Sequence, residues 1–259
     1  RTRGRLGTAS ATLSTAVREG ATHLILSDEK VSADRAAIPM ILATGAVHVH
    51  LLRQQLRTFT SLNVRSGECL DVHHFAVLIG VGATTINAYV AEAAIEDRRN
   101  RGLFGEMSLD QCLDHYRKAV DQGLLKVMSK MGIAVISSYR GGANFEALGL
   151  SRTLVAEYFP SMASRISGIG MIGIQRRVLA LHARAWSEDF VALPVGGFYK
   201  FRKSGETHAW AAELIHMLQS AVASDSYQTF KKYSDGVQKA PPVAIRDLLD
   251  FVPTGRQVA

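Results

Sequence analysis

The feature that most constrains the fold is an alternation, over the first half of the chain, between short apolar runs and longer segments with helical periodicity. Short runs of apolar or β-branched residues between turn signals are typical of buried strands. Three runs predict strands, at residues 23–27 (HLILS), 58–64 (TFTSLNV) and 133–136 (IAVI). Helices are predicted over four segments, residues 36–56, 70–78, 84–101 and 108–131. Short strands separated by helices indicate βα units with a parallel sheet, so the expected class is α/β, either an open doubly wound sheet or part of a (β/α) barrel.

Residues with special end preferences support these helices. Pro39 fits the first turn of the helix at 36–56, where its missing N–H does no harm. Ser108 followed by Gln111 is a capping-box pattern, and Gly132 fits the end of the same helix.

The chain changes character after about Ser151, and the rest is predicted to be a mainly helical tail. No strand of ordinary length is predicted after residue 136, and residues 193–199 (LPVGGFY) predict an ordered connection. The predicted helices cover residues 151–159, 174–186, 208–223 and 227–251, the last with a break at Pro241 and Pro242.

Composition narrows the class of protein. With 259 residues, 47% of them hydrophobic and 20% charged, the chain can bury a substantial core. The net charge of +7 is spread along the chain and aromatic residues make up only 7%, which disfavours a nucleic-acid-binding face. The excess charge is explained more simply by a solvated surface or by contacts with an acidic partner.

Cysteine usage and hydropathy predict a reduced, cytoplasmic protein without a membrane segment. Cys69 and Cys112 are too few for a disulfide framework or an iron–sulfur cluster, and both are expected to be core thiols. The most apolar run, residues 75–86, is shorter than the roughly 18 residues that suggest a membrane span. Residues 1–20 do not resemble a signal peptide, and the absence of an initiator Met predicts a piece cut from a longer chain.

Two short patterns suggest ligand sites that their context does not support. Residues 168–173 (GIGMIG) match the letters of a dinucleotide fingerprint, but no predicted strand precedes them, so a glycine turn is the better interpretation. The histidine pairs at 48/50 and 73/74 diverge on a helix, which disfavours a shared metal ion. Asp71 and His74 could share a helical face, but no third ligand is apparent.

The segment at residues 137–146 (SSYRGGANFE) is the strongest candidate for a functional site. It follows the predicted strand at 133–136, and α/β proteins usually carry function where strands end. Its side chains could bind an anion or hold a neighbouring domain, and an ordinary βα turn explains them equally well. The candidate residues are Ser138, Tyr139, Arg140, Gly141, Gly142, Asn144 and Glu146. The sequence contains no Gly-x-Ser-x-Gly elbow and no cysteine in an activating environment, so no catalytic or cofactor-binding residue is assigned.

Several long strings closely resemble the large (α) subunit of bacterial glutamate synthase. They cover nearly the whole chain in the same order, so the resemblance is much more specific than any short motif. The strings are HLILSDE (23–29), AIPMILATGAVHV (37–49), ECLDVHHFAVLIGVGATTINAYV (68–90), DQGLLKVMSKMGIAVISSYRGGA (121–143), NFEALGLSRTLVAEYFPS (144–161), FYKFRKSGETHAWA (198–211) and VAIRDLLDF (243–251).

The resemblance implies that the chain contains parts of two domains. Residues 1–170 resemble the C-terminal part of the family's central domain, and residues 195–259 resemble the helical start of the FMN-binding synthase domain. Residues 171–194 would be the segment that connects these two domains. The nucleophilic cysteine of the amidotransferase, the FMN loops and the cysteines of the 3Fe–4S cluster would all lie outside this chain. By this resemblance the chain itself binds no cofactor.

For the longer polypeptide the resemblance implies conversion of glutamine, 2-oxoglutarate and reductant into two glutamates. Ammonia would pass through an internal tunnel, and electrons would come from NADPH through a small (β) subunit that carries FAD. The expected partners are the other domains of the same polypeptide, the small subunit and further copies in a homo-oligomer, with no nucleic acid and no membrane. Residues 137–146 are expected to face the synthase domain or the tunnel.

Two other hypotheses about the function remain. The chain could be a self-sufficient flavin- or phosphate-binding α/β barrel enzyme, against which stands the prediction of three strands where a barrel needs eight. It could also be an interaction module, for which the net charge of +7 is the only support.

Overall fold

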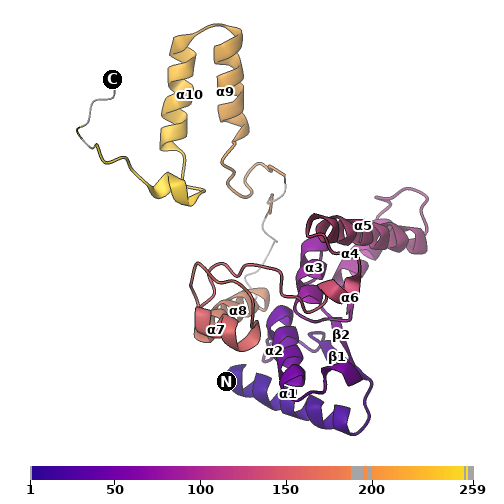
Figure 1. The fold of residues 1–259 in the computed structure, drawn as a ribbon. Helices are drawn as coiled ribbons and strands as arrows, with labels where there is room; N and C mark the ends of the chain where they lie inside the picture. Colours follow the sequence, from indigo (N-terminus) through magenta and orange to yellow (C-terminus); the bar gives the residue numbers. More distant parts are fainter. Residues whose placement is uncertain (1, 188–194, 198–199, 254, 256–259) are drawn as a thin grey trace. The chain divides into compact units, whose positions relative to one another are not determined.

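The computed structural model describes residues 2–187, 195–197, 200–253 and 255 (Figure 1). By their contacts the residues divide into two compact units, residues 1–187 and residues 188–259. Part of the predicted connection at 193–199, namely residues 193, 194, 198 and 199, lies outside the described residues. The first unit begins with α1 (Thr2–Arg18), a helix that the sequence patterns did not indicate.

The first unit is built around a parallel sheet in the order β1-β2-β3. β1 (His23–Ser27) pairs with β2 (Ser61–Arg65) in register from end to end, and β3 (Thr85–Asn87) pairs with the other edge of β2. The crossovers carry α2 (Met40–Arg53), a short 3₁₀ turn η1 (Arg57–Phe59) and α3 (Val72–Gly80). The predicted α/β class with parallel βα units is confirmed.

The predicted strand at residues 133–136 is wrong. α5 (Leu109–Lys130) is followed by a turn at Gly132, and the short helix α6 (Ile136–Tyr139) begins at the last residue of the predicted strand. Val135 and Ile136 are 54% and 46% exposed, so the run lies outside the sheet. A strand forms only where its backbone groups meet a neighbouring strand, and the free edge of β2 is occupied by β3.

That third strand lies within a segment predicted as helix. The helix expected at 84–101 gives way to β3 at its first residues, and α4 (Tyr89–Asn100) begins after it. The β-branched residues Thr84, Thr85 and Ile86 favour the extended conformation once β2 lies beside them.

Helix ends follow the predicted local chemistry. Ser108 Oγ accepts from Gln111 N at 3.2 Å and Ser108 N donates to Gln111 Oε1 at 2.9 Å, which is the expected capping box of α5. Gly132 ends this helix with a φ of +68°, a conformation in which glycine is unstrained. Pro39 stands at the N-cap, because α2 begins one residue later than the proline.

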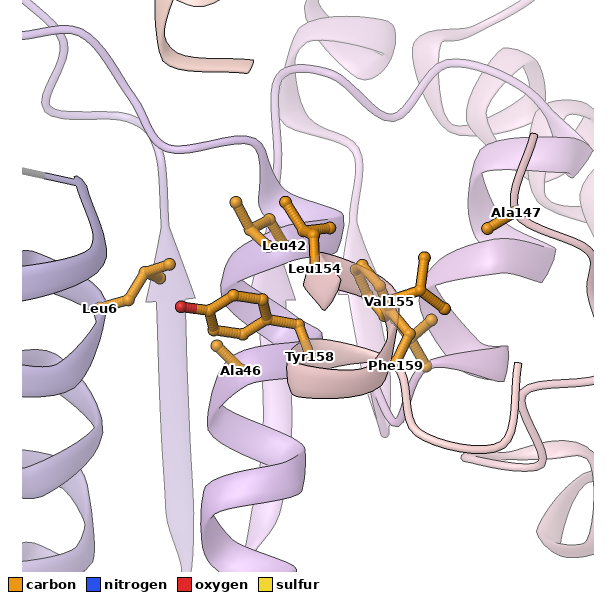
Figure 2. Close-up of a cluster of buried hydrophobic side chains, with 9 residues drawn as sticks. Leu6, Leu42, Ala46, Ala147, Leu154, Val155, Tyr158 and Phe159 are labelled. Carbon is orange, nitrogen blue, oxygen red and sulfur yellow. The ribbon is translucent and has the colours of Figure 1, made fainter. Parts of the chain in front are cut away.

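A hydrophobic cluster joins α1, α2 and α7 (Arg152–Tyr158) (Figure 2). The hydroxyl end of the Tyr158 ring lies next to Leu6 of α1 and Ala46 of α2, and the ring of Phe159 lies against Gly45 of α2. Three further clusters fill the space between the sheet and the surrounding helices. The last helix of this unit, α8 (Met171–Ala185), contacts α1.

The described part of the second unit is helical. α9 (Ala212–Ala223) and α10 (Tyr227–Lys239) pack against each other, and the 3₁₀ turn η2 (Ile245–Leu248) follows the break at Pro241 and Pro242. Ser226 Oγ caps α10 by accepting from Thr229 N at 3.3 Å. Within the described residues no strand follows Asn87, so the prediction of a mainly helical tail is confirmed.

Candidate functional site

Residues 137–146 lie against the C-terminal end of α3. Gly141 N donates to Ile79 O and Ala143 N donates to Gly80 O, each at 3.0 Å, so the segment satisfies carbonyl groups that a helix end leaves open. Because α3 runs back from the end of β2 to the start of β3, this position is at the amino-terminal edge of the sheet. The expectation that the segment follows a strand at the carboxyl edge is therefore wrong, for the same reason that 133–136 is no strand.

Tyr139 is the anchor of the segment. Its side chain is 1% exposed, its hydroxyl donates to Ala76 O at 3.1 Å, and its ring meets Phe145 edge to face. A side chain at Gly80 would overlap the ring of Phe145, so this glycine lets the segment approach α3 closely. Tyr139 therefore has a structural role.

The other candidate residues are exposed or half-buried and do not converge on one point. Glu146 forms an ion pair with Arg165 at 3.3 Å, away from the turn at Gly141 and Gly142. Ser138, Arg140, Gly142 and Asn144 face solvent.

His48 and Arg57 form a polar pair that no sequence pattern indicates. Arg57 Nε donates to His48 Nδ1 at 3.0 Å, and the other guanidinium nitrogens donate to Thr60 O, Gly82 O and Thr84 Oγ1 at 2.7, 2.8 and 3.3 Å. Burial, and then the charges of Arg57 and Arg140, lower the pKa of His48 to about 4. The imidazole is therefore neutral near pH 7, with its proton on Nε2 because Nδ1 accepts.

A cavity of about 190 Å³ lies beside this pair and is lined by residues 141–143, the C-terminal end of α3 and the segment after α7. Gly82 and Gly141 have φ values of +118° and +72°, and a side chain at Gly82 would overlap the ring of His48. Sequence patterns gave no signal for Arg57, since it stands alone between a helix and a strand.

Polar groups at the carboxyl edge of the sheet bind one another. Asp28 accepts from Gly67 N at 2.9 Å and from Ser66 Oγ at 3.2 Å, which joins the end of β1 to the end of β2. Burial, followed by a hydrogen bond to Asp28, raises the pKa of Tyr89 to about 12. Because the carboxylate already accepts three donors, this cluster stabilises the strand ends.

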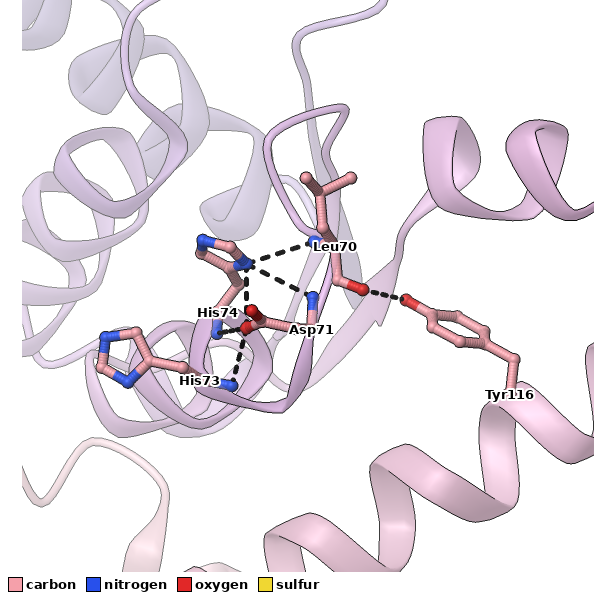
Figure 3. A network of polar contacts seen from close by, with 5 residues as sticks. All are labelled: Leu70, Asp71, His73, His74 and Tyr116. Atoms are coloured by element: carbon pink, nitrogen blue, oxygen red, sulfur yellow. Dashed lines mark hydrogen bonds and ion pairs between the residues drawn. The ribbon is translucent and has the colours of Figure 1, made fainter. Parts of the chain in front are cut away.

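The residues considered as metal ligands cap a helix instead (Figure 3). Asp71 Oδ1 accepts from His73 N at 3.0 Å and from His74 N at 3.4 Å, and Nδ1 of His74 accepts from Asp71 N at 3.3 Å. Tyr116 of α5 donates to Leu70 O at 3.0 Å and fixes the turn before the cap. In the described part of the chain, no three His, Cys, Asp or Glu side chains are placed to hold a metal ion.

Both cysteines are free and buried. Burial, and then the charge of Asp71, raise the pKa of Cys69 to about 12, so its sulfur stays a protonated thiol and a poor nucleophile.

The glycine-rich turn at 168–173 packs against another segment of backbone. Ile169 N donates to Gly149 O at 2.9 Å, and a side chain at Gly168 would overlap that carbonyl. Among the described elements, the one directly before the turn is the helix α7 and not a strand, which agrees with the interpretation as a glycine turn. None of the described helices is both long enough and apolar enough to span a bilayer.

A protein-family model and several known relatives all match the same family. The model of the glutamate synthase central domain matches residues 3–151. The NADPH glutamate synthase large chain of Azospirillum brasilense is 66% identical over 239 residues, which are 92% of this chain and 16% of that protein. The large chain of Bacillus subtilis (strain 168) is 39% identical over 237 residues, and the ferredoxin-dependent glutamate synthase of Spinacia oleracea is 37% identical over 248. These cover 91% of this chain and 16% and 15% of the respective relatives, so the chain spans only a small part of their length. The chain belongs to the glutamate synthase central-domain family.

Proposed function

We propose that this chain is a non-catalytic connecting segment of a glutamate synthase large subunit. The longer polypeptide would convert glutamine, 2-oxoglutarate and a reductant into two molecules of glutamate. The observation that carries the proposal is the 66% identity to a glutamate synthase large chain over 92% of this chain. Asp28 accepts hydrogen bonds from Ser66 and Gly67 of the same chain, which supports a structural role for the segment itself.

In this proposal residues 1–170 belong to the central domain and residues 195–259 form the first part of the FMN-binding synthase domain. Residues 171–194 connect the two domains. FMN and a 3Fe–4S cluster would be held by other parts of the large subunit, and FAD and NADPH by a small subunit. The higher identity to an NADPH-type than to a ferredoxin-type relative supports NADPH as the donor. The buried free thiols fit a reducing compartment such as the cytoplasm.

Residues 137–146 would then help to keep ammonia away from water between two active sites. Ammonia reacts as a nucleophile only while it is unprotonated, so a path between the sites needs closed walls. The exposed Arg140 next to the glycine turn is the side chain on this segment best placed to bind a neighbouring domain.

Exchange of Arg140 tests this role in the full-length enzyme. We expect Arg140→Ala to lower the glutamate formed per glutamine hydrolysed and to release ammonia, with the FMN content unchanged. Arg177→Ala, on the exposed face of α8, is the matched control and should keep the wild-type ratio. A wild-type ratio in the Arg140 variant would contradict the role of this segment.

A further inference from the structure

We propose that the cavity lined by His48 is a carboxylate-binding site, in which His48 supplies a hydrogen-bond donor and the nearby charges of Arg57 and Arg140 attract the anion. Nothing in the connecting role described above requires such a site, and its test does not depend on that role. The walls come from α2, the C-terminal end of α3 and residues 141–143. None of the described residues that line the cavity is acidic.

The first observation is a hydrogen-bond donor fixed at the cavity wall. Arg57 Nε donates a hydrogen bond to His48 Nδ1 at 3.0 Å, so the ring proton of the neutral imidazole is on Nε2. A Cβ atom on Gly141 would lie 3.0 Å from Nε2, so this nitrogen is directed toward the turn that lines the cavity. Within the described residues, His48 Nε2 has no protein acceptor.

The second observation is positive charge without a counter-ion. Arg57 donates only to neutral acceptors, namely His48, two backbone carbonyls and Thr84. Arg140 is adjacent to the cavity-lining Gly141, and its charge acts on both His48 and Arg57. In the described part of the chain no carboxylate pairs with either guanidinium. Two neighbouring cations are stabilised by an anion between them, and a carboxylate has the planar shape that guanidinium groups bind best.

The third observation is size. Because one water molecule occupies about 30 Å³ of liquid, a cavity of about 190 Å³ holds a group of a few heavy atoms. The hydroxyl-bearing residues Ser161 and Tyr158 and the ring of His48 are among the lining, and the other lining residues are apolar or glycine. A small carboxylic acid, or the side chain of an Asp or Glu from a neighbouring segment of a longer polypeptide, has this size and charge.

Titration calorimetry with glutarate tests the site directly. We expect the 259-residue chain to bind glutarate at one site, with a shift of the His48 Nε2 resonance in ¹⁵N NMR spectra. Arg140→Gln should weaken binding by up to about tenfold, because it removes one of the two positive charges near the cavity. Arg177→Gln has the same change of charge away from the cavity and should bind as the wild type.

The full-length polypeptide distinguishes the two sources of the carboxylate. Glutarate binding that Arg140→Gln weakens in both proteins indicates a free ligand, whereas binding that depends on Arg140 in the 259-residue chain alone indicates that a neighbouring side chain fills the cavity. No binding by the 259-residue chain, equal binding by both variants, or equal competition by chloride would overturn the proposal. None of these results depends on the glutamate formed per glutamine hydrolysed. The connecting role and the carboxylate site can therefore be disproved independently of each other.

Discussion

At the scale of single residues, the environment of His48 determines its charge. Its ring lies between α2 and the glycine turn, next to two arginines and without an acidic neighbour among the lining residues. Burial and the two positive charges act in the same direction, because each disfavours the imidazolium. An ordinary histidine on an amphipathic helix thus becomes a neutral hydrogen-bond donor.

The lowered pKa of His48 predicts a pH dependence of stability. The pKa falls from 6.5 in the unfolded chain to about 4 in the folded protein, so the unfolded state binds more protons between these values. We expect the free energy of unfolding to fall by about 2 kcal/mol from this group as the pH drops from about 6.5 to about 4, after allowance for partial exposure.

Urea unfolding at a series of pH values measures this effect. Because carboxylates also titrate in the window, the informative quantity is the difference from His48→Gln, which should lose less stability on acidification. His73→Gln, at an exposed position on α3, is the control and should follow the wild type. Parallel loss in the wild type and His48→Gln would contradict the prediction.

At the scale of elements, close contact between helices determines how α2 lies against α7. A Cβ atom at Gly45 would stand 2.8 Å from Tyr158 O and 2.5 Å from the ring of Phe159. The absence of a side chain at this position therefore lets the two segments pack at backbone distance.

This contact predicts that Gly45→Ala destabilises the protein although alanine favours helices. We expect a loss of about 2 kcal/mol from overpacking, measured by chemical unfolding. Gly7 in α1 is the matched control, because a Cβ atom there meets nothing within 4 Å. Gly7→Ala should be neutral or stabilise by up to about 1 kcal/mol, and an equal effect of both changes would show that packing at Gly45 is unimportant.

The elements also show what local patterns predict well. Ser108 with Gln111 and Gly132 were identified as caps because they act through atoms a few residues away. Residues 133–136 were predicted as a strand and residues 85–87 as part of a helix, and both predictions are wrong. The reason is that pairing with β2, a contact between distant residues, decides which run becomes the third strand.

At the scale of the whole molecule, the described strands form a three-stranded parallel sheet, whereas a closed barrel has eight strands. We therefore expect the 259-residue chain not to bind FMN. Flavin fluorescence quenching measures this, with an intact FMN-dependent barrel enzyme as the positive control. Saturable binding with one FMN per chain would instead support a self-sufficient flavin enzyme.

The candidate site was only partly predictable. Gly141, Gly142 and Arg140 were named because glycines and a cation after an apolar run are typical of a binding turn. His48 and Arg57 were missed as a pair, since they come from different elements and meet only when the chain between them folds back. Tyr139 is one of the candidate site residues, but its side chain is buried and anchors the segment to α3.

The sequence by itself determined the parallel α/β class, the helical tail and the helix caps, because periodicity and capping depend on residues within a turn or two of one another. The strings of identical residues determined the family. Only the tertiary structure decided which apolar run became the third strand, on which edge of the sheet residues 137–146 lie, and that Arg57 pairs with the histidine that lines a cavity. These features depend on contacts between distant residues, and such contacts leave no local pattern in the chain.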